Sequence, residues 1–272
     1  MKSLNYTHLV IFFISLSVTT LNAQLHKSII TPNAGKLSSL INISEVSNIR
    51  SLQITGPLDA RDFAYIRQMQ KLEKLDLSNS TIKAYKGKGG TAYNDTDTTL
   101  YAANEIPQTA FFDLNSGSKC DSIKLIILPK SCTSIGMAAF ESCDKLIEVK
   151  NIEQLLSISE MAFNNCSLLR EFTLGAHLSY LGSQAFCRSG LQLIRFKCQE
   201  LDGLDTSTFY FCSNLKQINI GTPLPTKFNI TDGLFLALHA DIEKIVVNIP
   251  RGTKNLFEKD LNWNIFKKFV EY

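Results

Sequence analysis

Apolar positions recur along the chain with a fixed spacing. Phe140 is followed by further phenylalanines at 163, 186 and 209, each 23 residues after the last, and a small residue or threonine precedes every one of them. Other positions keep the same phase: an aliphatic residue stands five positions before each phenylalanine, and a cysteine or serine stands three positions after it. Such self-similarity predicts a solenoid, in which each unit buries its apolar face only against neighbouring units.

Each unit also carries one segment with the length and alternation of a short strand. Residues 169–174 and 215–220 show this pattern, and the Ala-Phe turn of each unit supplies the opposite wall of the core. We therefore expect an α/β repeat fold: a leucine-rich-repeat solenoid with a parallel β-sheet on one face, short turns and helices on the other, and a C-terminal cap. The 23-residue repeats are expected over residues 105–240.

The chain before these repeats holds a less regular version of them. Over residues 24–104, Leu72, Leu75 and Leu77 match the leucine-rich spacing, and an equivalent strand precedes them by 23 residues. Asp59 between the two strands is a candidate N-cap for a helix. Residues 83–104 break the pattern with glycines and polar residues, which predicts an insertion loop that is either functional or mobile.

The C-terminal segment 241–272 has the character of a cap. Residues 245–249 alternate as a last strand, and residues 253–269 form an amphipathic segment that carries Trp263 and Phe266. We expect these two aromatic side chains to lie against the last strand, because a solenoid must cover the exposed end of its core.

Residues 1–23 have the form of a secretory signal peptide. An apolar run follows Lys2 and ends at the small residue Ala23. The alternative is a membrane anchor, but serines and threonines interrupt the run, which is shorter than the roughly 20 residues that a spanning helix needs. The mature protein is therefore expected to have no transmembrane segment and to be secreted or exposed at the cell surface.

The net charge and the absence of catalytic and metal-binding motifs exclude several classes of function. The net charge of +3 over 272 residues is too small to recruit nucleic acid. Neither His177 nor His239 has a partner at metal-ligand spacing, and the glycines at 87, 89 and 90 lack the pattern of a phosphate loop. We expect no catalytic residues, no metal and no cofactor, and we expect the glycine segment to be a flexible loop.

The seven cysteines do not suggest a disulfide framework. Cys143, Cys166 and Cys212 share the phase of the core positions. We predict that they are buried thiols, which behave as small hydrophobic side chains. The alternative is that cysteines of neighbouring units are cross-linked, since adjacent strands lie about 4.8 Å apart.

The unit Ile-Gly-x-x-Ala-Phe-x-x-Cys-x-x-Leu-x-x-Val over residues 135–149 resembles the repeat of BspA-like leucine-rich-repeat proteins. The Leu-Asp-Leu-Ser at 75–78 and the Ile-Pro-Arg-Gly-Thr-Lys at 249–254, followed by Trp263, are also similar to that family. The resemblance implies a secreted or surface-exposed bacterial protein that binds other proteins, with adhesion to host matrix or to another cell as the usual proposal. It implies no catalysis.

A partner surface is predicted where strand side chains point outward. Side chains alternate across a strand, so those between the inward positions stack into one ribbon along the sheet. Its charged members sum to +3, and Ile127, Ile147 and Leu193 add apolar contacts. The candidate binding residues for a protein or glycan ligand are Lys124, Lys150, Arg170, Thr173, Arg195, Lys216 and Gln217. The alternatives are that these are merely solvated strand residues, and that the protein is a structural or antigenic surface protein without a defined ligand.

Overall fold

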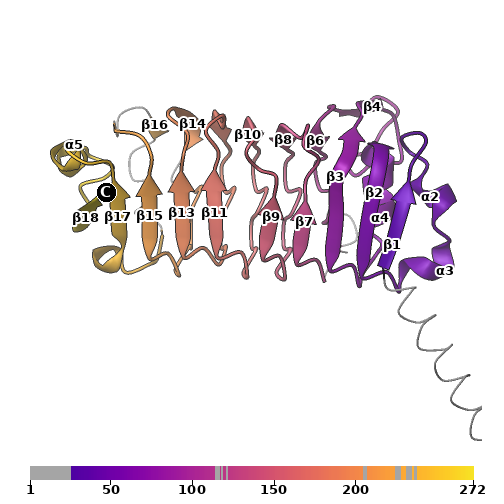
Figure 1. The fold of residues 1–272 in the computed structure, drawn as a ribbon, viewed down its shortest axis with the longest axis horizontal. Helices are drawn as coiled ribbons and strands as arrows, with labels where there is room; N and C mark the ends of the chain where they lie inside the picture. The colour runs from indigo at the N-terminus through magenta and orange to yellow at the C-terminus, as the bar shows by residue number, and fades with distance from the viewer. Residues whose placement is uncertain are drawn as a thin grey trace, which may run out of the picture.

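A computed structural model describes residues 26–113, 117, 119–120, 122–204, 207–223, 228–230, 235 and 238–272. The expected signal peptide, 1–23, lies outside the described residues. The chain winds into an elongated solenoid of stacked coils, and the two ends of the described chain lie at opposite ends of the molecule (Figure 1). The predicted fold class is confirmed by the parallel pairing of successive strands.

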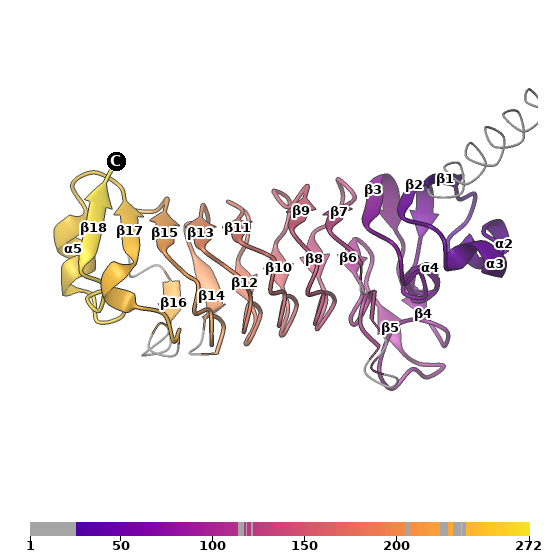
Figure 2. The same cartoon turned by 90° about the horizontal axis from the view of Figure 1, so that it is seen from below.

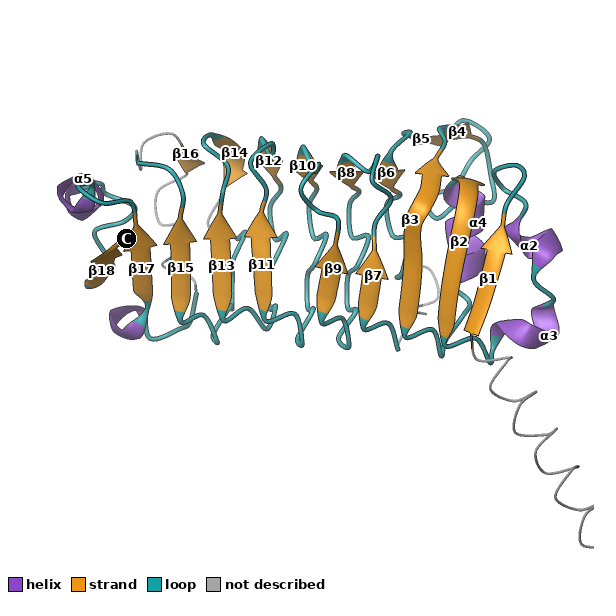
Figure 3. Ribbon diagram, viewed as in Figure 1, coloured by secondary structure: helices purple, strands orange, loops and turns teal. Residues whose placement is uncertain are grey.

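One long face of the solenoid, here called the ribbon face, carries the longer strands (Figure 3). They form two parallel sheets, ordered β1-β2-β3-β7-β9 and β11-β13-β15-β17-β18. The strands of the first are β1 (His26–Ile30), β2 (Ser51–Leu58), β3 (Lys74–Ile82), β7 (Leu125–Ile127) and β9 (Glu148–Lys150). Those of the second are β11 (Glu171–Leu174), β13 (Leu193–Phe196), β15 (Gln217–Ile220), β17 (Val246–Ile249) and β18 (Lys268–Glu271).

The opposite wall also carries a parallel sheet, where the sequence predicted only turns and helices. Its strands are mostly two residues long and follow the order β16-β14-β12-β10-β8-β6 (Figure 2). They are β6 (Glu105–Ile106), β8 (Ser134–Ile135), β10 (Ser157–Ile158), β12 (Tyr180–Leu181), β14 (Leu201–Leu204) and β16 (Phe228–Ile230). The aliphatic residue five positions before each repeat phenylalanine lies here and is fully buried.

The core between the two walls is a ladder of phenylalanine rings, one from each coil. Consecutive rings stack with interplanar angles of 15° or less and centroids 4.9 to 6.1 Å apart. The rungs are Phe111, Phe140, Phe163, Phe186, Phe209 and Phe235. A residue that repeats every coil thus stacks on its own copies, which is why the period in the sequence is so strict.

The cysteine prediction is confirmed. All seven cysteines lie within the described residues, and each is a buried thiol outside any disulfide. Cys166 and Cys212 donate their thiols to the carbonyl oxygens of Phe140 and Phe186, at 3.1 and 3.0 Å. Burial raises the pKa of Cys143 and Cys166 well above the usual range for a thiol. The thiols of Cys166 and Cys212 therefore join neighbouring coils by hydrogen bonds instead of disulfides.

The N-terminal end of the core is covered by three short helices, α2 (Leu37–Leu40), α3 (Ile43–Val46) and α4 (Ala60–Ile66). Asp59 caps α4 as predicted, accepting a hydrogen bond from the backbone N–H of Arg61 at 2.9 Å. Asp62 in the first turn accepts hydrogen bonds from the backbone N–H groups of Gly35 and Leu37. This carboxylate therefore fastens the segment after β1 to α4.

The segment 83–104 is structured. It contains an antiparallel pair, β4 (Tyr85–Lys86) and β5 (Leu100–Tyr101). Asp95 accepts hydrogen bonds from the backbone N–H groups of Gly89 and Gly90, at 2.5 and 3.1 Å, and from the hydroxyl of Tyr101. The glycine segment was expected to be a flexible loop. Instead, the backbone N–H groups of Gly89 and Gly90 bind an anionic group, and that group is the carboxylate of Asp95 in the same chain.

At the C-terminal end the last ribbon-face strand is β18, one strand later than predicted. The segment expected to be amphipathic is helical only over α5 (Lys254–Lys259), and a single 3-10 turn, η2 (Ile242–Lys244), precedes β17. Trp263 and Phe266 are buried as predicted. The Trp263 ring packs on Phe196 and Phe235 at 6.5 and 5.1 Å, so the aromatic cluster continues the core.

Candidate functional site

The outward side chains of the ribbon face lie where alternation placed them. In β11, β13 and β15 the inward residues are buried and the residues between them are half-buried or exposed. Of the seven candidate residues, four are exposed and three are half-buried. The exposed ones are Lys124, Lys150, Arg170 and Lys216, and the half-buried ones are Thr173, Arg195 and Gln217.

Ion pairs along the ribbon face neutralise part of its positive charge. Lys124 contacts Glu73 at 2.8 Å, and Arg50 pairs with the same carboxylate, so the pKa of Glu73 is lowered by both cations. Lys150 lies 3.5 Å from Glu148, and Arg195 lies 3.0 Å from Glu171. These partially exposed pairs add little stability.

Two of the candidate cations are not neutralised by an ion pair among the described residues and can interact with a ligand. In the described part of the chain, neither Arg170 nor Lys216 has a carboxylate partner. The net charge of +3 predicted for the ribbon leaves out Glu73, which stands one coil before Lys124. The available positive charge is therefore concentrated around β11 and β15.

The sheet on the ribbon face is interrupted between β9 and β11. The first sheet ends at β9 and the second begins at β11, although the coils that carry them are consecutive in sequence. Figure 1 shows these two strands farther apart than any other neighbours on this face. On the opposite wall the same coils remain paired through β8, β10 and β12. The solenoid thus opens on one side only.

Two residues at the opening depart from the repeat pattern. Asn151 follows β9 at a position where the other coils carry a buried apolar residue, such as Leu128 or Leu174. It adopts a left-handed backbone with φ of 60°, and its side-chain amide donates to the carbonyl oxygen of Leu128 at 2.9 Å, which ends the strand. Phe172 fills the inward position of β11 with a ring that packs on both Phe163 and Phe186, where neighbouring coils have valine or isoleucine.

The opening forms a groove, here called the β9–β11 groove. It consists of two adjoining hollows of about 540 and 390 Å³ that share Glu148, Val149, Ile152 and Thr173. Val149 and Phe172 form its floor and are 7% and 4% exposed, whereas Ile126 and Ile194 at the equivalent inward positions are fully covered. The groove therefore exposes part of the core.

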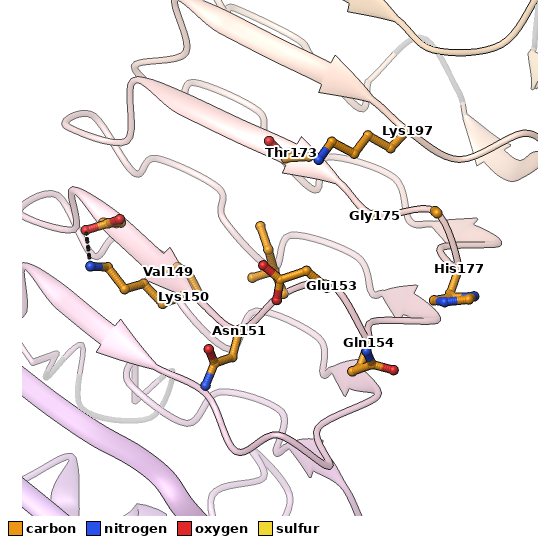
Figure 4. A pocket seen from close by; sticks show the side chains of 12 residues that line it. Val149, Lys150, Asn151, Glu153, Gln154, Thr173, Gly175, His177 and Lys197 are labelled. Atoms are coloured by element: carbon orange, nitrogen blue, oxygen red, sulfur yellow. Dashed lines mark ion pairs between the residues drawn. The ribbon is translucent and has the colours of Figure 1, made fainter.

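The rim of the groove is charged. In Figure 4, Lys150 and Glu153 project from the side of β9, and Thr173 and Lys197 lie on the side of β11. Arg170 and Arg195 line the end where the strands begin. The structure thus brings Lys150, Arg170, Thr173 and Arg195 together around one groove, while Lys124 and Lys216 lie outside it.

A third hollow of about 360 Å³ lies beside β15. Arg195, Gln217 and Asn248 are among its lining residues. Gln217 and Asn248 both donate to the side-chain oxygen of Asn219, at 2.9 and 2.7 Å, and Tyr272 closes one end. This row of amides is fixed by its own hydrogen bonds, so it offers a polar patch next to the groove.

The described residues contain no group of three or more His, Cys, Asp or Glu side chains that could hold a metal ion. His177 lines the groove, and the ring of His239 stacks on Phe211 with centroids 4.0 Å apart. No helix in the described ranges has the length and apolar character to span a membrane.

Three solved structures show low similarity to this chain. The pneumococcal vaccine antigen PcpA is 14% identical with a TM-score of 0.48, over 82% of this chain and 60% of that one. A Treponema pallidum leucine-rich repeat protein is 23% identical with a TM-score of 0.42, over 53% of this chain and 64% of that one. A leucine-rich repeat protein from Bacteroides ovatus is 15% identical with a TM-score of 0.37, over 89% of this chain and 72% of that one. The chain thus spans less than two thirds of the first two proteins.

The sequence comparison identifies the repeat itself. Among curated proteins no sequence matches the chain. Residues 104–235 match the family model described as the BspA type leucine rich repeat region, in six copies. These are the same coils that carry the phenylalanine ladder and both sides of the β9–β11 groove. Residues 104–235 therefore consist of BspA-type leucine-rich repeats.

Proposed function

We propose that this protein is exported by its N-terminal segment and binds another protein or a glycan through the ribbon face of its solenoid. The observation that carries the proposal is the β9–β11 groove, where an apolar floor and a charged rim meet in the middle of that face. Extended solenoid faces of this kind provide large binding surfaces. The partner class is a component of host matrix or of another cell surface, and the protein performs no catalysis.

Charge supports the choice of face. Arg170 lines the groove and has no carboxylate partner in the described structure, Lys216 has none and lies outside the groove, and Arg195 pairs with Glu171. An unpaired cation at the rim of an apolar groove favours a ligand with acidic groups, through specificity and the rate of encounter. The second candidate function, a structural or antigenic protein without a ligand, requires no such arrangement.

A binding screen tests the proposal. The chain from residue 24 onward is screened against matrix proteins, mucins and a glycan array, and any ligand is titrated against the double variant Arg170→Glu, Arg195→Glu. We expect at least one ligand, and we expect the double variant to reduce its affinity roughly tenfold or more.

The matched control is Lys36→Glu, Lys259→Glu, which changes the net charge equally. Lys36 precedes α2 and Lys259 ends α5, so both lie at the ends of the molecule, and both are exposed. This control should bind like the wild type. Equal loss in both variants would indicate that only overall charge matters, and the absence of any ligand would favour the structural alternative.

A further inference from the structure

Both strands that border the β9–β11 groove are sheet edges. The register of the paired strands shows which backbone groups face the groove. Glu148 and Lys150 bond toward β7, and Phe172 and Leu174 bond toward β13. Backbone groups alternate between the two neighbours of a strand, so Val149 on β9 and Glu171 and Thr173 on β11 direct their N–H and C=O groups into the groove.

No strand pairing joins these edges, although every residue from 122 to 204 is described. Buried or partly buried backbone groups are nearly always hydrogen-bonded in proteins. Unpaired edges are also templates for pairing with another chain, so natural proteins cover or interrupt them. Here two such edges run parallel and face each other across an open groove.

Strands β9 and β11 stand farther apart than paired strands do. Nearly all Cα–Cα distances between β9 and β11 exceed 8 Å. Paired strands lie about 4.8 Å apart, so a strand inserted between β9 and β11 needs them to stand about 9.6 Å apart. An occupant of four or five residues would span the two strands at about 3.3 Å per residue.

The side chains of the groove specify such an occupant further. Alternate residues of an inserted strand would point down to Val149, Ile152 and Phe172, so they should be apolar. At the rim, Arg170 and Lys197 have no carboxylate partner within the described ranges, and Glu153 has no cation partner there. The rim thus has one unpaired cation more than it has unpaired anions, which favours acidic side chains in the occupant.

We propose that the β9–β11 groove binds an extended peptide segment of a partner protein, which adds as a strand between β9 and β11. Its alternate apolar side chains cover the exposed core, and its acidic side chains reach Arg170 and Lys197. This inference rests on the proposed binding function and specifies its ligand class. A glycan has no row of backbone N–H and C=O groups in strand register, so the two facing edges favour a polypeptide.

Peptide selection provides the first test. A phage-displayed library of random twelve-residue peptides is selected on the chain from residue 24 onward. We expect peptides with apolar residues at alternate positions, at least one acidic residue and no proline in the central segment. Failure to select any peptide, or selection of peptides without alternation, would overturn the inference.

Backbone hydrogen bonding provides the second test. Synthetic versions of one selected peptide carry a single N-methyl group at each position in turn. Each methyl group within the added strand should weaken binding about tenfold, and those outside it should have no effect. Insensitivity to N-methylation throughout the peptide would contradict strand addition.

A pair of variants at one position of the protein completes the design. Thr173→Pro removes an N–H that faces the groove, and proline is tolerated at a sheet edge where that N–H is not bonded. Thr173→Val changes the same side chain and keeps the N–H. We expect the peptide to bind the valine variant as it binds the wild type and the proline variant about tenfold more weakly; equal binding would contradict the inference. If the proline variant does not fold, the N-methylated peptides decide.

The outcomes separate this inference from the function on which it rests. A ligand from the matrix and glycan screen that is lost in the Arg170→Glu, Arg195→Glu variant, together with failure of the peptide selection, would overturn strand addition alone. A selected peptide that passes both backbone tests supports strand addition even if the screen returns no ligand.

Discussion

The ladder of phenylalanines leads to a quantitative prediction at its middle rung, Phe163. The Phe163 ring contacts Phe140, Phe172 and Phe186 with centroids 5.1, 5.1 and 5.3 Å apart. Replacing Phe163 by leucine keeps an apolar side chain and removes three ring pairs, each of which contributes about 0.5–1.5 kcal/mol beyond its buried area. We expect Phe163→Leu to lower the free energy of unfolding by about 1.5–4.5 kcal/mol. Phe163→Ala also leaves a cavity and should cost about 3–5 kcal/mol or more.

Urea unfolding measures this loss. Far-UV circular dichroism reports on all coils, and fluorescence of the single tryptophan, Trp263, reports on the C-terminal cap. With a slope near 3 kcal/mol per molar urea, the midpoint of the leucine variant should fall by roughly 0.5–1.5 M. Ile158→Val in the same coil is the control and should cost about 0.5–1.5 kcal/mol. A loss below about 1 kcal/mol in Phe163→Leu would refute the argument that ring stacking holds the coils together.

Three further predictions concern the thiols, the inserted hairpin and the cap. Burial raises the pKa of Cys132, Cys198 and Cys212 from 9.0 to about 11, so the unfolded chain loses these protons first. The stability that each protonated thiol contributes is fully present below about pH 9 and is lost as the pH rises through about 11. The free energy of unfolding should fall by about 2 kcal/mol for each thiol by pH 11. Urea unfolding at pH 8 and 10.5 should show a shallower fall in Cys212→Ala, and equal falls would contradict this cause. Asp95→Ala removes the acceptor for Gly89, Gly90 and Tyr101, so limited proteolysis should cleave within residues 83–104 faster than in Asp97→Ala, which alters an exposed ion pair. Trp263→Ala should lower the free energy of unfolding by about 3–5 kcal/mol, and truncation after Pro250 should lower the melting temperature; an unchanged, monomeric truncated protein would show that residues 251–272 do not cap the core.

The sequence predicted the features that depend on burial in every coil. The phase of Phe140 and of Cys143 and the outward direction of Arg170 follow from a pattern repeated four times, and each copy strengthens the others. The sheet on the opposite wall could not be predicted from the sequence, because strands such as β8 and β10 contain only two residues, too few to show alternation. Strand β1 was also missed, since its outward and inward positions mix charged, polar and apolar residues.

The groove was missed for a different reason. Only two residues, Asn151 and Phe172, mark the groove in the sequence, and each occurs in a single copy of the repeat. A consensus over all copies hides such single differences. Alignment of the coils places Asn151 in a column with Leu128, Leu174 and Phe196, and it is the polar member of that column. A repeat protein forms its scaffold from what its copies share, so the position where one copy differs is the place to look for function.

The same departure predicts how the groove can be closed. In the wild type, amide hydrogen exchange should be fast at Val149, Glu171 and Thr173, whose N–H groups face the groove, and slow at Phe172, whose N–H group faces the paired strand β13. Leucine is strained at the left-handed backbone of Asn151, so Asn151→Leu should return that residue to the extended conformation of the other coils and extend β9 toward β11. We expect the three fast amides to gain protection in this variant and the selected peptide to bind more weakly. If exchange at Val149 and Thr173 stays fast in Asn151→Leu, then Asn151 does not hold the sheet open, and the ring of Phe172 between Phe163 and Phe186 is left as the cause.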